Sequence, residues 1–126
     1  MASVLALRPR VLVLDEPTAE LDPASSVAVF DLLARYAREH GTTVIVVEQK
    51  IALLSDYADM LVIGGRIRFA DAPEAVLAHA DTLLALGVNV PRATTLVNTL
   101  ADRGLYDGPA VRTVAGAVAA AKEVLA

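Results

Sequence analysis

The sequence predicts an α/β fold in which parallel strands alternate with helices. Two short runs of branched apolar residues, at residues 11–14 and 44–47, have the composition of buried strands. A helical pattern separates the two runs, and a connection of that length joins parallel strands by a right-handed crossover. The composition agrees, because 56% of the 126 residues are hydrophobic and only 4% are aromatic. Such Ala, Val and Leu usage is typical of a parallel sheet with flanking helices.

The first strand is expected at residues 11–15, and two adjacent acids, Asp15 and Glu16, stand at its end. Two neighbouring carboxylates at the end of a buried strand cost free energy unless a cation or hydrogen bonds compensate them. Ligand sites of open parallel sheets lie at the carboxyl ends of strands, where acids hold metals or activate water. An acidic turn stopped by Pro17, with no chemical role, is the simpler interpretation of these residues alone.

The next element is a helix, expected over residues 23–40. Asp22 can accept hydrogen bonds from the free amides of the first turn, and the fixed φ of Pro23 suits the first helical position. Gly41 can take the left-handed conformation that ends helices. The spacing of apolar residues predicts an inner face of Phe30, Leu33, Tyr36 and Ala37.

Shorter elements follow the second strand. A helix is expected between Lys50 and Tyr57. Two short strands are predicted at residues 60–63 and 66–69, around a turn at Gly64-Gly65.

The composition changes after His79, and the rest of the chain reads as helical. Residues 81–86 are expected to continue a helix, which the segment 87–91 breaks with Gly and Pro. A further helix is predicted at residues 92–103, before Gly104 and a turn at residues 107–109. The last helix is expected at residues 110–125, where apolar residues recur at helical spacing: Val111, Val114, Val118 and Leu125.

The composition also excludes several functions. There is no cysteine, so disulfides, thiol catalysis and cysteine metal sites are excluded. The net charge is −4 with no Lys/Arg cluster, which argues against nucleic-acid binding. No apolar run approaches the roughly 20 residues that a membrane span needs, and the first residues lack a signal-peptide arrangement. A cytoplasmic protein is therefore expected.

Several motifs, in order, resemble those of ATP-binding-cassette (ABC) ATPases. Residues 14–18 (Leu-Asp-Glu-Pro-Thr) and 21–23 (Leu-Asp-Pro) resemble the Walker B strand and the D-loop of this family. Residues 42–50 resemble its switch strand, with Gln49 where the family usually has histidine. Residues 57–67 and 72–77 resemble the strand and the helix that follow it. The resemblance implies the carboxyl-terminal part of a P-loop NTPase of the ABC type.

Two segments of the family pattern are missing from these 126 residues. No Gly-x-x-x-x-Gly-Lys-Ser/Thr phosphate loop (Walker A) occurs, nor does the Leu-Ser-Gly-Gly-Gln signature. Residues 1–80 are therefore expected to be a partial ABC core. Residues 81–126 resemble the carboxyl-terminal extension of energy-coupling-factor and cobalt-type transporter ATPases. Glu48, where threonine is common elsewhere in the superfamily, points to the same branch.

The resemblance assigns roles to four residues. Asp15 would support the Mg²⁺ of bound ATP, usually through water, and Glu16 would polarise the attacking water as the catalytic base. Asp22 would reach the ATP site across a dimer interface in addition to capping its helix. Gln49 stands where a histidine contacts the γ-phosphate, and it can donate a hydrogen bond but cannot become a cation. ATP, Mg²⁺, a second ABC ATPase subunit and a transmembrane transporter subunit are the implied cofactors and partners. The chain would be peripheral to the cell membrane through the transporter subunits.

Two functions remain open at this stage. One is an ATP-binding and ATP-hydrolysing transporter subunit, present as a carboxyl-terminal fragment that is inactive alone. The other is a non-catalytic split or degenerate remnant that serves as an interaction or regulatory module. The missing phosphate loop and Gln49 favour the second function, whereas the intact Asp15, Glu16 and Asp22 favour the first. A truncated gene would also explain the missing segments, and the transported substrate is not encoded in these motifs.

Overall fold

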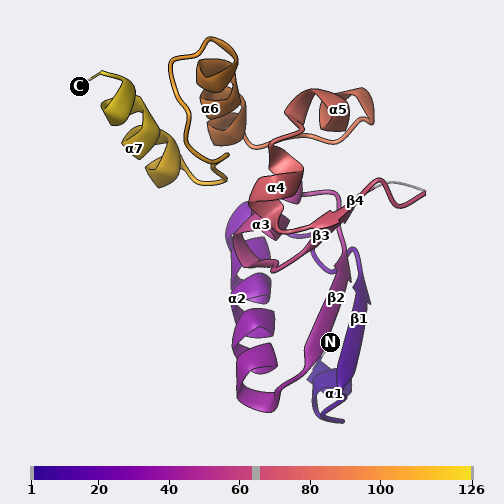
Figure 1. Ribbon diagram of the computed structural model, residues 1–126. Helices are drawn as coiled ribbons and strands as arrows, with labels where there is room; N and C mark the ends of the chain where they lie inside the picture. The colour runs from indigo at the N-terminus through magenta and orange to yellow at the C-terminus, as the bar shows by residue number, and fades with distance from the viewer. Residues whose placement is uncertain (1, 64–65, 126) are drawn as a thin grey trace. The chain divides into compact units, whose positions relative to one another are not determined.

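The computed structural model describes residues 2–63 and 66–125 of the chain (Figure 1). The chain forms two compact units, residues 1–49 and 50–126. The turn expected at Gly64-Gly65 lies outside the described residues. No helix in the described ranges is long and apolar enough to cross a membrane.

The first unit contains the predicted strand–helix–strand arrangement. Its elements are α1 (Ala2–Leu5), β1 (Val11–Asp15), α2 (Pro23–His40) and β2 (Thr43–Val47). Strands β1 and β2 are parallel, in a register that runs from the pair Val11–Thr43 to the pair Asp15–Val47. The predicted parallel sheet is therefore confirmed, and the carboxyl ends of both strands lie at the same edge.

Helix α2 begins and ends as the sequence predicts. The Asp22 side chain accepts hydrogen bonds from the amides of Ala24 and Ser25, at 2.9 and 3.1 Å. Gly41 has a left-handed φ of 62°, which a residue with a side chain would adopt only with strain. The buried side of the helix is formed by Ser26, Phe30, Leu33 and Tyr36, and Ala37 is half-buried.

The prediction that β1 and β2 are continuously buried is wrong. Leu12 is buried with 3% of its surface exposed, but its neighbours Val11 and Val13 are 54% and 64% exposed. On β2, Ile45 and Val47 are likewise exposed, by 50% and 56%. Successive side chains of a strand point to opposite faces, and α2 packs on the face that carries Leu12. The other face of the pair is apolar and exposed in the first unit.

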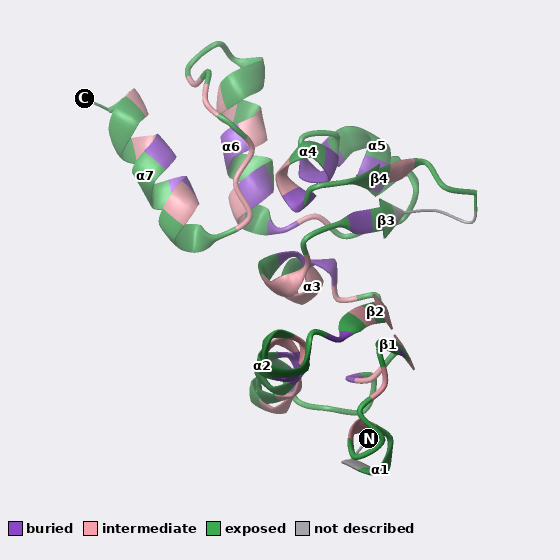
Figure 2. Cartoon of the chain, turned by 60° about the horizontal axis from the view of Figure 1, so that its bottom comes forward, coloured by how far each residue is buried: buried purple, intermediate pink, exposed green. Residues whose placement is uncertain are grey.

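The second unit contains a short hairpin and five helices among its described residues. These elements are α3 (Ile51–Tyr57), β3 (Leu61–Ile63), β4 (Phe69–Asp71), α4 (Pro73–Leu77), α5 (Ala80–Ala85), α6 (Arg92–Asp102) and α7 (Val114–Val124). A core of buried apolar side chains joins α3, β3, α4 and α5. Its members are Ile51, Leu61, Val76, Leu77 and Leu83. The buried residues of α6 and α7 lie on the sides where these two helices approach each other (Figure 2).

Strand β4 begins later than predicted. It was expected at residues 66–69 but covers Phe69–Asp71, in an antiparallel pair with β3 that starts at Ile63–Phe69. Phe69 packs against the core of the unit, whereas Ile67 is 75% exposed. The strand therefore starts at the first residue that buries an apolar side chain.

Helix α7 also differs from the prediction at its start and in its buried face. It begins at Val114 instead of residue 110, because the Thr113 hydroxyl accepts a hydrogen bond from the Gly116 amide and caps the helix there. Its buried residues are Ala117 and Ala120, which pack with Val97 of α6. Of the four apolar residues at helical spacing, Val111 packs against this cluster, whereas Val114 and Leu125 are 75% and 85% exposed. Small side chains allow the two helices to approach closely.

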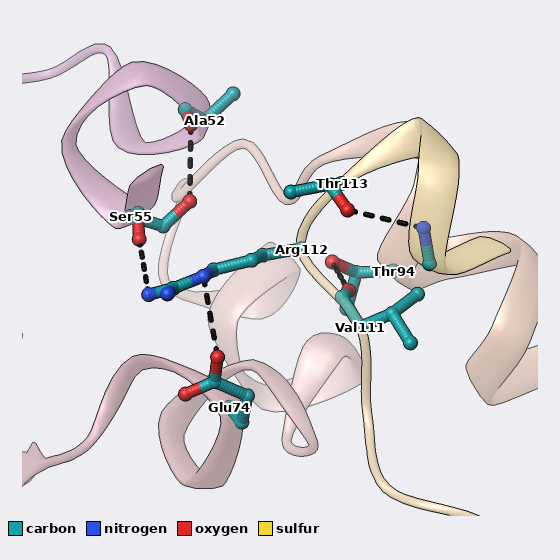
Figure 3. Close-up of polar contacts among 8 residues, drawn as sticks. Ala52, Ser55, Glu74, Thr94, Val111, Arg112 and Thr113 are labelled. Atoms are coloured by element: carbon teal, nitrogen blue, oxygen red, sulfur yellow. Dashed lines mark hydrogen bonds and ion pairs between the residues drawn. The ribbon is translucent and has the colours of Figure 1, made fainter. Parts of the chain in front are cut away.

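The residues before α7 are held in place by polar contacts with the preceding helices (Figure 3). Arg112 donates a hydrogen bond from Nη1 to the Ser55 carbonyl oxygen at 2.7 Å, and its Nε lies 3.2 Å from a Glu74 carboxylate oxygen. The Thr94 hydroxyl donates to the Val111 carbonyl oxygen. These three contacts tie the connection to α3, α4 and α6, so it runs without helical structure up to Thr113.

Candidate functional site

The two predicted acids lie at the carboxyl end of β1. Asp15 is the last residue of the strand and pairs with Val47 of β2. The Glu16 amide donates to the Val47 carbonyl oxygen at 2.8 Å, so the ladder continues one residue beyond the strand. Both acidic side chains are exposed. The structure therefore presents an adjacent pair of carboxylates at the sheet edge where ligands of parallel sheets bind.

The backbone of Glu16 is in an unusual conformation. Its φ is 43°, in the left-handed region that residues with a side chain seldom adopt. This conformation costs about 1–2 kcal/mol for a residue other than glycine. The Glu16 carbonyl oxygen accepts from the Ala19 amide at 3.2 Å, so a turn begins directly at the acid. Strain of this kind persists only where the surrounding structure fixes the residue.

Gln49 is brought to Glu16 by the parallel pairing of the strands. Its Nε2 donates a hydrogen bond to Glu16 Oε1 at 2.5 Å, although the two residues are 33 positions apart in the sequence. Gln49 follows β2 by two residues, and Glu16 follows β1 by one, so the two side chains leave the same sheet edge. The pair corresponds to the two residues that the resemblance assigns to catalysis.

A second pair of residues at this edge was not predicted. The Thr18 hydroxyl donates to Glu48 Oε1, and Oε2 of Glu48 accepts from the Gln49 amide at 3.3 Å. Thr18 is completely buried and Glu48 is half-buried. The sequence motif contains Thr18 without giving it a role of its own, and Glu48 indicates only the branch of the family. The usable signal was a hydroxyl and a carboxylate close to the ends of two adjacent parallel strands.

Asp22 lies at the beginning of α2, and the hydrogen bonds that it accepts come from the first turn of that helix. Besides the two amides, the Ser25 hydroxyl donates to Oδ2 at 2.5 Å. The Ser25 hydroxyl and then its amide are the main causes that hold the pKa of Asp22 below its usual value, while desolvation acts in the opposite direction. The capping role is confirmed, and the interface role stays a prediction.

The acidic pair fits part of a Mg²⁺–nucleotide site. Within the described ranges, no three acidic or histidine side chains are close enough together to hold a metal ion unaided. Mg²⁺ in nucleotide sites is commonly bound by one or two carboxylates, water molecules and the phosphates themselves. Exposed acids at a strand end, as in Asp15 and Glu16, meet that requirement when another element supplies the phosphates.

Comparison with known proteins identifies the family. No protein-family model matches the chain. An energy-coupling factor transporter ATP-binding protein of Symbiobacterium thermophilum is 41% identical, over 100% of this chain and 44% of that protein. Another, of Halalkalibacterium halodurans, is 37% identical over 86% of this chain and 40% of that protein. The solved structure of cbiO1 from Clostridium perfringens, described as part of the ABC transporter complex cbiONQ, has a TM-score of 0.58 and 33% identity. It matches 72% of this chain and 37% of that chain.

The chain belongs to the ABC transporter ATP-binding proteins. It spans less than half of the length of these relatives. The ABC ATP-binding assignment confirms the expected α/β class, and relatives of the energy-coupling factor type confirm the expected branch. The Symbiobacterium protein aligns over the whole chain, including the helical residues after position 80.

Proposed function

We propose that the chain provides the water-activating part of an ATP-hydrolysing subunit of an energy-coupling-factor type ABC transporter. The observation that carries the proposal is the hydrogen bond from Gln49 Nε2 to Glu16 Oε1 at the carboxyl end of the parallel strands. It orients the carboxylate that the family resemblance assigns to catalysis. The family membership and the adjacent Asp15 support the same assignment.

The residues of this chain would act by position and charge. Gln49 holds one oxygen of the Glu16 carboxylate, and a carboxylate held by one oxygen can accept the proton of a water molecule at the other. Asp15 would hold the Mg²⁺ of ATP through water, and the metal would neutralise charge that develops on the phosphates. Asp22 would contribute at an interface with a second ATPase subunit. The phosphates require a binding loop that these 126 residues do not contain.

Gln49 limits the rate that such a site can reach. Its amide can hold Glu16 and donate to a phosphate oxygen, but it cannot take up or release a proton at neutral pH. A histidine at this position can do both. We therefore expect slow hydrolysis even in an assembled site.

The proposal extends to the organisation and partners of the chain. Residues 1–80 would be the ABC core part and residues 81–126 a helical extension. The complete subunit would pair with a second ATPase subunit and a transmembrane transporter subunit, on the cytoplasmic side of the membrane. The two relatives' names and the cbiONQ complex support an assembly with transporter subunits.

A chimera tests the function directly. Residues 1–126 would replace the matching 44% of the Symbiobacterium relative, whose remaining part would bring the missing segments. We expect Mg²⁺-dependent ATP hydrolysis, which Glu16→Gln should lower by about 10²–10⁴-fold, as loss of a general base does. ATP binding should be retained. Glu20→Gln, which neutralises an exposed acid of the same loop, is the matched control and should leave the rate unchanged.

The chain alone gives the complementary measurement. Calorimetric titration with Mg²⁺–ATP should show no binding tighter than micromolar, because the loop that holds the phosphates is missing. Tight binding would contradict the proposed division of the site.

The non-catalytic alternative rests on Gln49 and on the missing phosphate loop. If the chain acts only as an interaction module, Glu16→Gln should leave transport-dependent growth of the source organism unchanged. An inactive or trapped transporter in that variant would exclude the alternative.

A further inference from the structure

We propose that Thr18 and Glu48 form a positioning pair that sets the side chain of Gln49 against Glu16. The consequence for ATP hydrolysis rests on the proposed function, whereas the positioning itself does not. Neither residue is expected to contact the nucleotide, so both are positioning residues.

The Glu48 carboxylate is held by two different segments. Oε1 accepts from the hydroxyl of Thr18, which lies in the loop between β1 and α2. Oε2 accepts from the Gln49 amide at 3.3 Å. The backbone at Gln49 is therefore anchored to the loop through Glu48, immediately before the side chain that donates to Glu16.

The burial of Thr18 strengthens its hydrogen bond to Glu48. Thr18 is fully buried, and a buried hydroxyl without a partner would cost free energy. Its acceptor is a carboxylate, and hydrogen bonds to an ionised group are stronger than those between neutral groups. The Thr18 carbonyl oxygen also accepts from the Leu21 amide at 3.2 Å, so Thr18 is fixed on the loop side as well.

Two hydrogen bonds, donated in opposite directions, connect the loop after β1 with the residues after β2. One runs from Thr18 to Glu48 and the other from Gln49 to Glu16, so two residues of the loop hold two consecutive residues after β2. The same loop continues through Leu21 to Asp22, at the start of α2. A displacement of this loop would therefore be transmitted to Gln49, and through it to the orientation of the Glu16 carboxylate.

The test uses the 126-residue chain labelled with ¹⁵N. Glu16→Gln should shift the Gln49 side-chain amide resonance, because it replaces the charged acceptor of that amide. In a Thr18→Val background the same substitution should produce less than half of this shift, since Gln49 is no longer held at Glu16. Thr18→Ser keeps the hydroxyl and should restore the full response.

A second variant keeps the test decisive if Thr18→Val fails to fold. Glu48→Gln keeps the size of the side chain but cannot accept at both ends, so it should weaken the response in the same direction. Circular dichroism establishes that each variant is folded. An unchanged Gln49 response in a folded Thr18→Val or Glu48→Gln chain would overturn the proposal and leave the pair with a structural role only.

Kinetics of the chimera separate this inference from the proposed function. Thr18→Val should lower kcat several-fold with little change in the KM for ATP, because substrate binding is not altered. A chimera that hydrolyses no ATP would contradict the proposed function, and the NMR response of Gln49 would still decide whether the pair positions it.

Discussion

The carboxylate of Asp22 combines exposure with a lowered pKa. The Ser25 hydroxyl is the largest cause, followed by the Ser25 amide, and both stabilise the ionised form. The shift thus originates in the hydrogen bonds of the helix cap. A group whose pKa is lower in the folded chain than in the unfolded chain stabilises the fold when it is ionised.

The pH dependence of stability should reveal this cap. Relative to Asp22→Asn, the wild-type chain should gain stability that is complete above the unfolded pKa of about 3.9 and lost as pH falls through the lower folded value. Urea unfolding at pH 7 and at pH 3, followed by circular dichroism, measures both differences. Ser25→Ala removes the main cause and should reduce the gain. A difference that is the same at both pH values would contradict this explanation.

At the scale of elements, the connection before α7 shows how tertiary contacts override a local pattern. Residues 110–113 are compatible with a helix, but Arg112 reaches Ser55 and Glu74 instead. The hydrogen bond to the Ser55 carbonyl involves a charged donor, worth about 1.5–3 kcal/mol. The ion pair with Glu74 is partly exposed, and such pairs contribute about 0–1 kcal/mol. The backbone carbonyl is thus the more important partner.

Substitutions can separate these two partners. Arg112→Met should lower the stability of α7 by about 2 kcal/mol, because it removes both contacts, whereas Glu74→Gln should cost less than about 1 kcal/mol. Hydrogen exchange of the α7 amides measures both effects. Arg103→Met, at an exposed arginine just after α6, is the matched control. Equal effects of the two variants would show that the ion pair dominates.

The elements that sequence predicts well are those with local signals. Asp22, Pro23 and Gly41 determine the ends of α2 through interactions within one or two turns. The start of α7 was misplaced because Arg112 acts over 57 residues, and the Thr18–Glu48 contact was missed because it spans 30. Val13 was expected to be buried because composition indicates a strand but not how many of its faces are covered. The sequence alone therefore did not predict contacts between residues far apart in the chain, nor which faces of the strands are covered by other elements.

At the scale of the whole molecule, the most consequential surface is the apolar face of β1 and β2 that the first unit leaves exposed. Val13 and Ile45 are directly opposite each other in the sheet register, and both are at least half exposed. Val11 and Val47 extend this apolar surface. Exposed apolar strands favour association with other chains.

The isolated chain should therefore self-associate. We expect its elution volume in size-exclusion chromatography to decrease as concentration rises, and Val13→Thr with Ile45→Thr to reduce this dependence. Val27→Thr changes an exposed valine of α2 in the same way and should have no such effect. A stable monomer at all concentrations would show that this face does not drive association.

The backbone at Glu16 has a consequence for how the chain evolves. Glycine and asparagine tolerate a positive φ better than glutamate does, so the local conformation favours replacing the acid. In a lineage that no longer needs the carboxylate, replacement of Glu16 by glycine or asparagine would therefore relieve backbone strain and stabilise the fold. Homologous chains with glycine or asparagine at this position are the ones in which to look first for lost ATP hydrolysis.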